Sequence, residues 1–448
     1  MARRPPLRLT APQLVAATFA LGILIGALLL SLPFAHTPGH ALTPLQAAFM
    51  ATSALSVTGL AVVDPGTSLS PFGQVVLLLL VQIGGLGIIT FGTLLALLAG
   101  RRLYFTDRVR LAQHFSALDV GGVLPLIRRI LLTTLAIELL GTLLLWARFA
   151  PEQGAGRGLY SAAFHAINAF NNAGFALYPD NLARYATDPF VTLVLSALII
   201  LGGLGFLVQL SVVAHLRNPR EHRLGVHVKI ALSVTAALLL VGIAGFALTE
   251  WTNPRTLGPL SPLGKLTASV FQGVTPRTSG LHTLPYDAMR PATLLLTTLL
   301  MFIGANPGST GGGIKTTTFY VVLRGVWNYA RGRGEPVTHH RRLDRDLITR
   351  AMTIALLGIG VLHAALLLLL LTNPSVPPMN ALFETVSALS TAGLSMNTTP
   401  HLNAAGHLLL IVLMYLGRVG PLMLATSLSA RASRDTVRYP PERDILLG

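Results

Sequence analysis

Four short segments of this chain share a pattern that suits cation binding by the backbone. They are Ser56-Val57-Thr58-Gly59-Leu60, Asn171-Asn172-Ala173-Gly174-Phe175, Arg277-Thr278-Ser279-Gly280-Leu281 and Ser390-Thr391-Ala392-Gly393-Leu394. In each, a glycine follows small or polar residues and precedes a large apolar one, and the glycines lie 115, 106 and 113 residues apart. Glycine tolerates positive φ, so successive carbonyls can point inward, where a ring of oxygens can replace the hydration shell of a cation.

We therefore predict that the four segments meet around one axis and form a filter, with no other metal site. The residues assigned to it are Val57, Thr58, Gly59, Asn172, Ala173, Gly174, Thr278, Ser279, Gly280, Thr391, Ala392 and Gly393. The alternative is helix packing, which is the commoner use of a single small-residue motif in an apolar segment. Four copies, each after an apolar segment too short to span a bilayer, favour the filter.

The composition indicates an integral membrane protein. Of the 448 residues, 52% are hydrophobic and 11% are charged, whereas soluble domains have roughly 25% charged residues. Several apolar runs contain no charged residue for about 20 positions, the length of a spanning helix. The basic residues that give the net charge of +16 lie between these runs and not in a region with interleaved aromatic residues, which argues against nucleic-acid binding. Since there is no cysteine, disulfides and thiolate metal sites are excluded.

Each glycine segment belongs to a repeating unit of long helix, half-length helix, glycine loop and long helix. The predicted opening spans are 12–32, 125–147, 229–251 and 349–372. The predicted half-helices are 41–55, 158–170, 261–272 and 378–389. The predicted closing spans are 74–98, 190–216, 293–323 and 407–430. A second motif, Gly-Gly-Leu-Gly or a variant, recurs 24 to 28 residues after three filter glycines, at residues 84–87, 202–205 and 417–420, and Gly304 holds the matching place in the remaining unit.

The fold class expected is all-α, with four tandem units and eight spans in a pseudo-fourfold arrangement. We place the units at residues 1–110, 111–223, 224–345 and 346–448, the last with a C-terminal tail. The N-terminus, the inter-unit connections and the tail hold 25 of the 33 Lys and Arg residues, and the pore-loop sides hold 7. By the positive-inside rule both termini are cytoplasmic. The basic start could also belong to a signal peptide, but the following run is too long for one.

The third closing span cannot be one continuous helix. Pro307 lies in it with five glycines, and Pro costs about 3 kcal/mol and Gly about 1 kcal/mol in a helix interior. A nucleotide-binding P-loop is excluded because Gly313-Ile314-Lys315 separates the glycine from the lysine and no strand precedes it. The break is predicted near the middle of the membrane, and a simple kinked helix remains the alternative.

The four-unit plan and the segment 304–319 (GANPGSTGGGIKTTTF) resemble the Trk/Ktr/HKT superfamily of potassium transporters. The resemblance covers essentially the whole chain and is greatest to the membrane subunit of the bacterial Ktr type, because the chain begins directly with the first unit. It implies that the four glycines are filter glycines and that the filter prefers potassium, whereas members with serine in the first place tend towards sodium. Local departures occur at Pro276 and Arg277 and at residues 305–307.

The resemblance also implies that the loop at residues 304–318 is an intramembrane gate. Its assigned residues are Gly304, Gly308, Ser309, Thr310, Gly311, Gly312, Gly313 and Lys315. Arg418 lies deep in the last span, where a cation costs at least ~2.5 kcal/mol, and is implied to raise an electrostatic barrier beside the gate.

Three further groups of polar residues carry expectations of their own. Glu384 is expected to hydrogen-bond behind the filter. Glu138 and His363 are expected to be buried pairs in outer spans, with a proton relay as the less favoured alternative. His339 and His340 are expected on a solvated face.

The function expected is passage of potassium inward down its electrochemical gradient, without enzymatic chemistry. The alternative is an alternating-access secondary cation transporter, which is marked by inverted repeats, whereas these repeats are parallel. The resemblance implies a homodimer on a ring of cytoplasmic nucleotide-binding regulatory subunits, docked mainly on residues 324–350. No cofactor is expected in this chain, nucleotide is expected only on the partner, and sodium is a candidate activator. The expected location is the bacterial inner (plasma) membrane, in contact with lipid.

Overall fold

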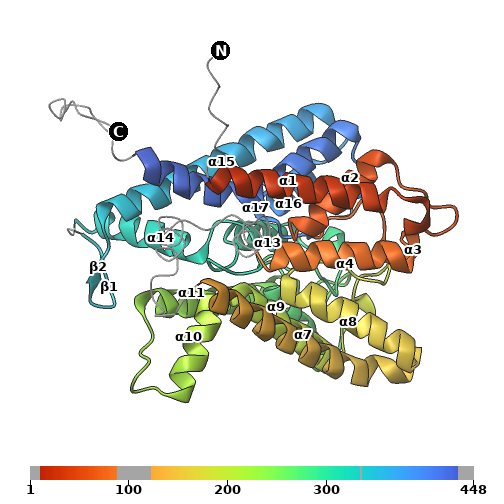
Figure 1. Cartoon of the computed structure of the whole chain (residues 1–448), viewed down its shortest axis with the longest axis horizontal. Coiled ribbons are helices and arrows are strands. Elements are labelled where there is room, and N and C mark those ends of the chain that lie inside the picture. The colour runs from red at the N-terminus through yellow and green to blue at the C-terminus, as the bar shows by residue number, and fades with distance from the viewer. Residues whose placement is uncertain (1–10, 88–122, 333–334, 432–448) are drawn as a thin grey trace, which may run out of the picture.

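The computed structural model describes residues 11–87, 123–332 and 335–431, which form long helices around a centre of short helices and loops (Figure 1). The first unit contains α1 (Ala11–Leu30), η1 (Pro33–Ala35), α2 (Pro44–Leu55), α3 (Pro65–Ser68) and α4 (Pro71–Gly85). The second contains α7 (Val123–Gln153), α8 (Ala155–Asn171), η2 (Ala183–Tyr185), α9 (Pro189–Leu204) and α10 (Phe206–Arg217).

The other two units follow the same order. The third contains α11 (Val226–Glu250), α12 (Pro262–Val274), η3 (Tyr286–Ala288), α13 (Pro291–Phe302), α14 (Thr316–Ala330), β1 (Val337–Thr338) and β2 (Arg341–Arg342). The fourth contains α15 (Arg345–Thr372), α16 (Pro378–Ser390), η4 (Thr399–His401) and α17 (Ala404–Arg431). The helices predicted before the filter segments are therefore α2, α8, α12 and α16, and each ends just before its glycine.

Short polar caps followed by proline set where these helices begin. Thr43 forms a capping box with Gln46 at the start of α2, and Ser261 accepts a hydrogen bond from a backbone N–H of the first turn of α12. Proline occupies the next position in both helices, where its missing N–H has no intrahelical partner to lose. Ser70 and Asp188 cap the closing helices α4 and α9 in the same way.

The closing helices depart from the predicted continuous spans. The expected span at 190–216 is wrong, because α9 and α10 meet at an angle of 102° around Gly205, which has φ +87°. α4 ends at Gly85 and Gly87 has φ +92°, so the helix predicted to continue to residue 98 also stops at its second glycine motif. Residues 88–98, the first unit boundary and the tail after residue 431 lie outside the described part of the chain. The break predicted in the third closing span is confirmed between α13 and α14.

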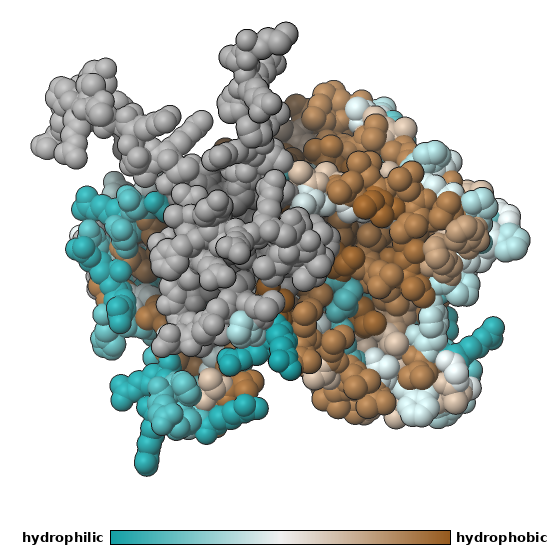
Figure 2. All heavy atoms as spheres, in the orientation of Figure 1, coloured by the Kyte–Doolittle hydropathy of each residue, from teal (hydrophilic) through white to brown (hydrophobic). Residues whose placement is uncertain are grey.

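Several outer helices have the length and surface of membrane spans. Among the described residues, α7 from Ile127, α11 and α15 could cross a membrane by length and composition, or four spans could if α9 and α10 count as one. Large apolar side chains lie exposed on the outer helices, including Leu28 on α1, Leu79 on α4 and Leu139 on α7. Figure 2 shows the resulting broad hydrophobic area, with hydrophilic residues collected at the end of the molecule that carries α10 and the β1–β2 hairpin. A continuous apolar surface of this kind suits lipid contact.

The C-terminal halves of the four half-helices, in contrast, are buried at the centre. Phe49 on α2, Phe164 on α8, Phe271 on α12 and Phe383 on α16 are each 0% exposed. Three half-helices pack against the opening and closing helices of their own unit, and α12 packs against its opening helix α11 and against α9 of the second unit. This arrangement holds the ends of the half-helices, and hence the glycine loops, in fixed positions.

Candidate functional site

The four glycine segments meet in a closed ring. A Cβ added at Gly59 would lie 2.5 Å from the carbonyl oxygen of Ala173 and 2.8 Å from Cα of Gly174. A Cβ at Gly174 would lie 3.0 Å from the oxygen of Ser279, and one at Gly280 would lie 3.2 Å from the oxygen of Ala392.

The fourth contact closes the circle, since a Cβ at Gly393 would meet the oxygen of Thr58. Each glycine thus faces the carbonyl that precedes the next glycine around the ring. The nearest atoms at all four positions are backbone atoms, so peptide groups and not side chains line this level.

Left-handed backbone at two positions shapes each segment. The four glycines have φ between +75° and +95°, and the residue two places earlier, Val57, Asn172, Thr278 or Thr391, also has positive φ. Positive φ is uncommon for a residue other than glycine and is an outlier for a β-branched one. Strain of this kind, of order 1–3 kcal/mol per residue, persists only where the surroundings enforce it and is common at functional sites.

In three units this conformation is the C-terminal cap of the half-helix. The N–H of Thr58 donates to the carbonyl of Ser53 (2.8 Å), that of Ala173 to Asn168 (2.9 Å) and that of Ala392 to Ser387 (2.8 Å). Together with the bond from the preceding residue to the carbonyl three places back, this is a Schellman motif with its left-handed residue at the first filter position. The helix end and the filter are therefore one hydrogen-bonded structure.

The third segment is built differently. Ser279 N–H donates to the carbonyl of Thr275 (3.0 Å), four residues back instead of five. The change coincides with Pro276 and Arg277, the residues at which the sequence departs from the expected pattern.

The second glycine motif supports the filter from below. A Cβ at Gly84 would meet the carbonyl oxygen of Leu55, one at Gly202 that of Phe170, and one at Gly417 that of Leu389. Each of these carbonyls lies four residues before the filter glycine of the same unit. Glycine in the closing helix thus lets its backbone touch the end of the half-helix.

The predicted gate loop lies directly against two filter segments. A Cβ at Gly311 would meet the hydroxyl oxygen of Thr278, and one at Gly312 would meet that of Thr391. These are the left-handed threonines of the third and fourth segments. The loop thus occupies the side of the filter toward the breaks in the closing helices.

Backbone hydrogen bonds fix the first half of this loop to the second unit. Asn306 N–H donates to the carbonyl of Gly203 (3.1 Å), and Thr310 N–H donates to that of Gly202 (3.2 Å). The hydroxyl of Thr310 donates to the carbonyl of Phe170 (3.2 Å).

Gly308 has φ +68° and its carbonyl accepts from the N–H of Phe206, the first residue of α10. The sharp bend between α9 and α10 therefore follows the gate loop. Ser309 stays within the loop and donates to Asn306 (2.6 Å).

Two cationic side chains attach to carbonyls of the gate loop. Arg418, 8% exposed, donates to the carbonyls of Thr310 and Gly84. Lys315 donates to the carbonyls of Gly311 (2.7 Å) and Gly312 (3.4 Å). Among the described residues no carboxylate forms an ion pair with either side chain.

Polar side chains brace the segment after the glycine in three units. Glu384 accepts hydrogen bonds from Met396 N–H (3.1 Å), Ser395 and Thr399, so its expected place behind the filter agrees with the contacts. His165 stands at the same offset from its glycine and accepts from Leu177 N–H (3.3 Å).

Its other nitrogen, Nδ1, therefore carries the proton and donates to the carbonyl of Ser161 (2.7 Å). In the third unit Gln272 donates to the carbonyl of Leu284 (2.9 Å). His165 and Gln272 were missed from the sequence, although His165 lies nine residues before Gly174, as Glu384 does before Gly393, and this shared distance was a usable signal.

The remaining candidate side chains are distributed as follows. Glu138 is 4% exposed and accepts from Gln82 (3.1 Å) and from Asn171 (2.8 Å), so its partners are amides and not a cation. The prediction of a buried pair is wrong for His363, which is exposed on α15. His339 and His340 form the turn of the β1–β2 hairpin and are both exposed.

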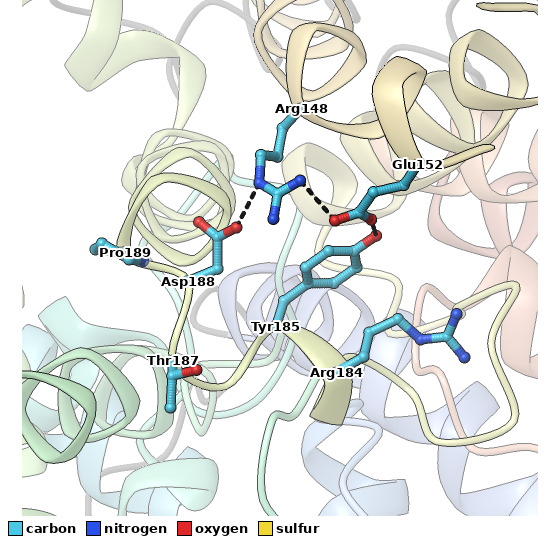
Figure 3. Close-up of a pocket in the computed structure, with 7 residues that line it drawn as sticks. All are labelled: Arg148, Glu152, Arg184, Tyr185, Thr187, Asp188 and Pro189. Atoms are coloured by element: carbon cyan, nitrogen blue, oxygen red, sulfur yellow. Dashed lines mark hydrogen bonds and ion pairs between the residues drawn. The ribbon is translucent and has the colours of Figure 1, made fainter. Parts of the chain in front are cut away.

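A surface cavity of about 450 Å³ lies away from the ring, where α7 and η2 meet the start of α9 (Figure 3). Arg148 donates to Asp188 (2.8 Å) and to Glu152 (2.5 Å), and Tyr185 donates to Glu152 (2.9 Å). Burial raises the pKa of Tyr185, which therefore stays protonated. Arg184 pairs with Asp180 outside the cavity. The charged side chains that line the cavity are thus already engaged in ion pairs.

Comparisons with known proteins agree with this arrangement. The TrkH family model, described as a cation transport protein, matches residues 13–436. The chain is 42% identical over 433 residues to Ktr system potassium uptake protein B of Bacillus subtilis, covering 97% of this chain and 96% of that protein. It is 36% identical over 453 residues to the potassium/sodium uptake protein NtpJ of Enterococcus hirae, covering 100% of this chain and 99% of that protein.

A solved structure shares the fold. The crystal structure of the potassium transporter TrkH from Vibrio parahaemolyticus matches with a TM-score of 0.69 and 20% identity, covering 95% of this chain and 86% of that one. The all-α membrane fold expected from the repeated units is confirmed.

Proposed function

Since this chain belongs to the TrkH family of cation transport proteins, we propose that it takes up potassium through the ring of glycine segments. The closed circle of backbone contacts from Gly59 to Gly393 is the observation that carries the proposal. Peptide oxygens at this ring replace the water around the ion, and no fixed charge is needed. The ends of the four half-helices add to this, because each C-terminus presents roughly half a negative charge near the ring.

The assigned filter residues act as a selectivity filter for potassium. All four units have glycine at the ring, so no side chain narrows it. The capping bonds of three half-helices hold peptide oxygens of the ring in place, and in this proposal their spacing suits potassium better than a smaller, more strongly hydrated ion. The relatives named as potassium uptake proteins support this choice of ion.

The gate is the loop from Gly304 to Thr318. Its contacts with Thr278 and Thr391 support this assignment, and in this proposal the loop obstructs the ion path, so that conduction requires it to move. Arg418 and Lys315 hold it through its carbonyls and place positive charge below the filter, which opposes a cation until they are displaced. Transport of this kind involves no chemical conversion of the ion.

The setting proposed is a bacterial plasma membrane, with both termini cytoplasmic and the units divided near residues 110, 223 and 345. α10 and the β1–β2 hairpin lie at the same end of the molecule (Figure 1), as expected if the inter-unit connections share one side. A homodimer resting on cytoplasmic nucleotide-binding regulatory subunits would use this basic end, with nucleotide on the partner only. The relative named for potassium and sodium keeps sodium as a candidate activator.

The test is uptake of radioactive rubidium by the purified protein in liposomes loaded with potassium. The proposal is supported if rubidium accumulates according to the potassium gradient in the absence of sodium. Excess external potassium should also inhibit this uptake far better than sodium does. Uptake that stops without a sodium gradient would instead favour alternating access. Absence of rubidium uptake under every gradient, in protein shown to be inserted and folded, would exclude the proposed function.

A further inference from the structure

We infer that Arg277 is a positioning residue that transmits the position of the gate loop to the third segment of the filter. The inference rests on the proposed function and adds a residue that the filter and gate assignments leave out. Arg277 directly precedes Thr278, the first filter residue of its unit. It is 6% exposed, and its side chain points away from solvent into the packing of α11 and the gate loop.

The guanidinium bridges two elements that are distant in sequence. One terminal nitrogen donates to the carbonyl of Thr235 on α11 (3.3 Å), and the other donates to the carbonyl of Gly304 (3.2 Å). Gly304 is the first residue of the gate loop. A displacement of this residue therefore pulls on the side chain of a residue that is continuous with the filter backbone.

The third unit differs from the other three in how its closing segment is connected to the end of its half-helix. In the other three, a glycine of the closing helix touches the half-helix end directly, as Gly84 touches Leu55. Gly304 occupies the corresponding place in the third unit. There, the nearest atoms to a Cβ on it belong to the gate loop itself, at Gly312 and Gly313. The side chain of Arg277 thus takes the place of a backbone contact.

Because a side chain replaces the backbone contact in the third unit, the filter segment and the gate loop stay connected while the loop can still move. A glycine packed against a carbonyl cannot shift without a clash, whereas a long side chain can follow a loop that moves. The loop end is further connected to the same helix, because the amide of Asn306 donates to the hydroxyl of Thr235 (3.0 Å). A void of about 10 Å³ lined by Arg277, Thr235 and Gly203 leaves the guanidinium little room for other partners.

The charge of Arg277 strengthens the link. Among the described residues no carboxylate pairs with it, so the two carbonyls carry its electrostatic stabilisation. Hydrogen bonds from a charged donor are stronger than neutral ones, and loss of either would leave a buried cation poorly solvated. Lysine cannot reproduce the bridge, because it lacks the planar fork that reaches two acceptors.

The experiment compares Arg277→Met, Arg418→Ala and the double variant in the liposome assay, with rubidium flux and the potassium-to-sodium preference measured separately. Arg277→Met removes both charge-assisted hydrogen bonds of the bridge and should lower the preference at least tenfold. In the wild-type background Arg418→Ala should change both flux and preference. In the Arg277→Met background it should still change flux but leave the preference where the first substitution set it.

Equal effects of Arg418→Ala on ion preference in both backgrounds would overturn the inference, since the filter would then sense the gate by another route. Wild-type protein without potassium-selective uptake would instead refute the proposed function. Leu240→Ala, at an exposed position of α11, is the control for expression and insertion. If Arg277→Met does not insert, Arg277→Lys replaces it in the same comparison, with the same two outcomes.

Discussion

Substitution of Gly59 by serine tests the close backbone contacts of the ring. The position has φ +95°, a conformation that L-residues rarely adopt, and the backbone strain alone costs of order 1–3 kcal/mol. The new Cβ would lie 2.5 Å from the oxygen of Ala173 and 2.8 Å from Cα of Gly174. Both atoms belong to the neighbouring filter segment, so relief requires that segment to move.

The expected result follows from which atoms move. An oxygen displaced from the ring weakens its contact with the ion, and each 1.4 kcal/mol lost corresponds to about a tenfold change in binding. We expect Gly59→Ser to lower the potassium-to-sodium preference by about tenfold or more in the rubidium uptake assay. Gly59→Ala should have nearly the same effect, because the Cβ and not the hydroxyl causes the clash.

Gly39 provides the matched control. It lies in a loop of the same unit with φ +87°, but a Cβ there would meet no atom within 4 Å. Gly39→Ser thus imposes comparable backbone strain and leaves the filter untouched. It should lower thermal stability without changing ion preference. The reasoning is refuted if Gly39→Ser and Gly59→Ser alter the preference equally, or if Gly59→Ser keeps the wild-type preference in folded protein.

Three further predictions concern side chains around the filter. Arg418→Ala should raise basal rubidium flux several-fold, because two hydrogen bonds from a charged donor, each about 1.5–3 kcal/mol, no longer hold the gate; flux that is unchanged in inserted protein would count against a gate. Glu384→Leu should lower the melting temperature of the detergent-solubilised protein, since an unpaired Met396 N–H costs about 1–3 kcal/mol; an unchanged melting curve would show that the brace is dispensable. His165→Leu should reduce ion preference by removing the acceptor of Leu177 N–H, and His165→Gln, which keeps an acceptor, should restore part of it; equal values for the two variants would contradict this role.

Much of the architecture could be predicted from local sequence signals. Thr43 and Ser261, each followed by proline, mark the starts of two half-helices, and the four glycines mark where those helices give way to loops. Pro307 and its neighbouring glycines indicated the break in the third closing span. These features depend on residues close in sequence, so they can be interpreted without knowledge of the fold.

The bend at Gly205 was not predictable in this way. The run from Phe190 to Leu216 has no proline, and its three glycines at residues 202, 203 and 205 lower the helix propensity but do not by themselves require a bend of 102°. The helix bends because the carbonyl of Gly308, about a hundred residues later, accepts the N–H of Phe206. A partner at that distance along the chain leaves no trace in the local pattern.

The candidate site was likewise only partly visible. The four glycine segments and the broken span at residues 304–318 could be located from the sequence, whereas the left-handed conformation of Val57 contradicts the preference of a β-branched residue. Arg277 was seen only as a departure from the pattern, since its acceptors on Thr235 and Gly304 lie 42 and 27 residues away. Tertiary contacts, and not propensity, decide both positions.

One polypeptide supplies all four quarters of the ring. This affects how mutations can change such a protein. Where identical subunits surround an axis, every substitution is repeated around it, and a residue that suits one role is imposed on all. Here a mutation alters a single quadrant, so the third can hold an arginine and a movable neighbour while the other three remain stiff. Sensing and discrimination can therefore be improved independently, although the ion encounters them as one ring.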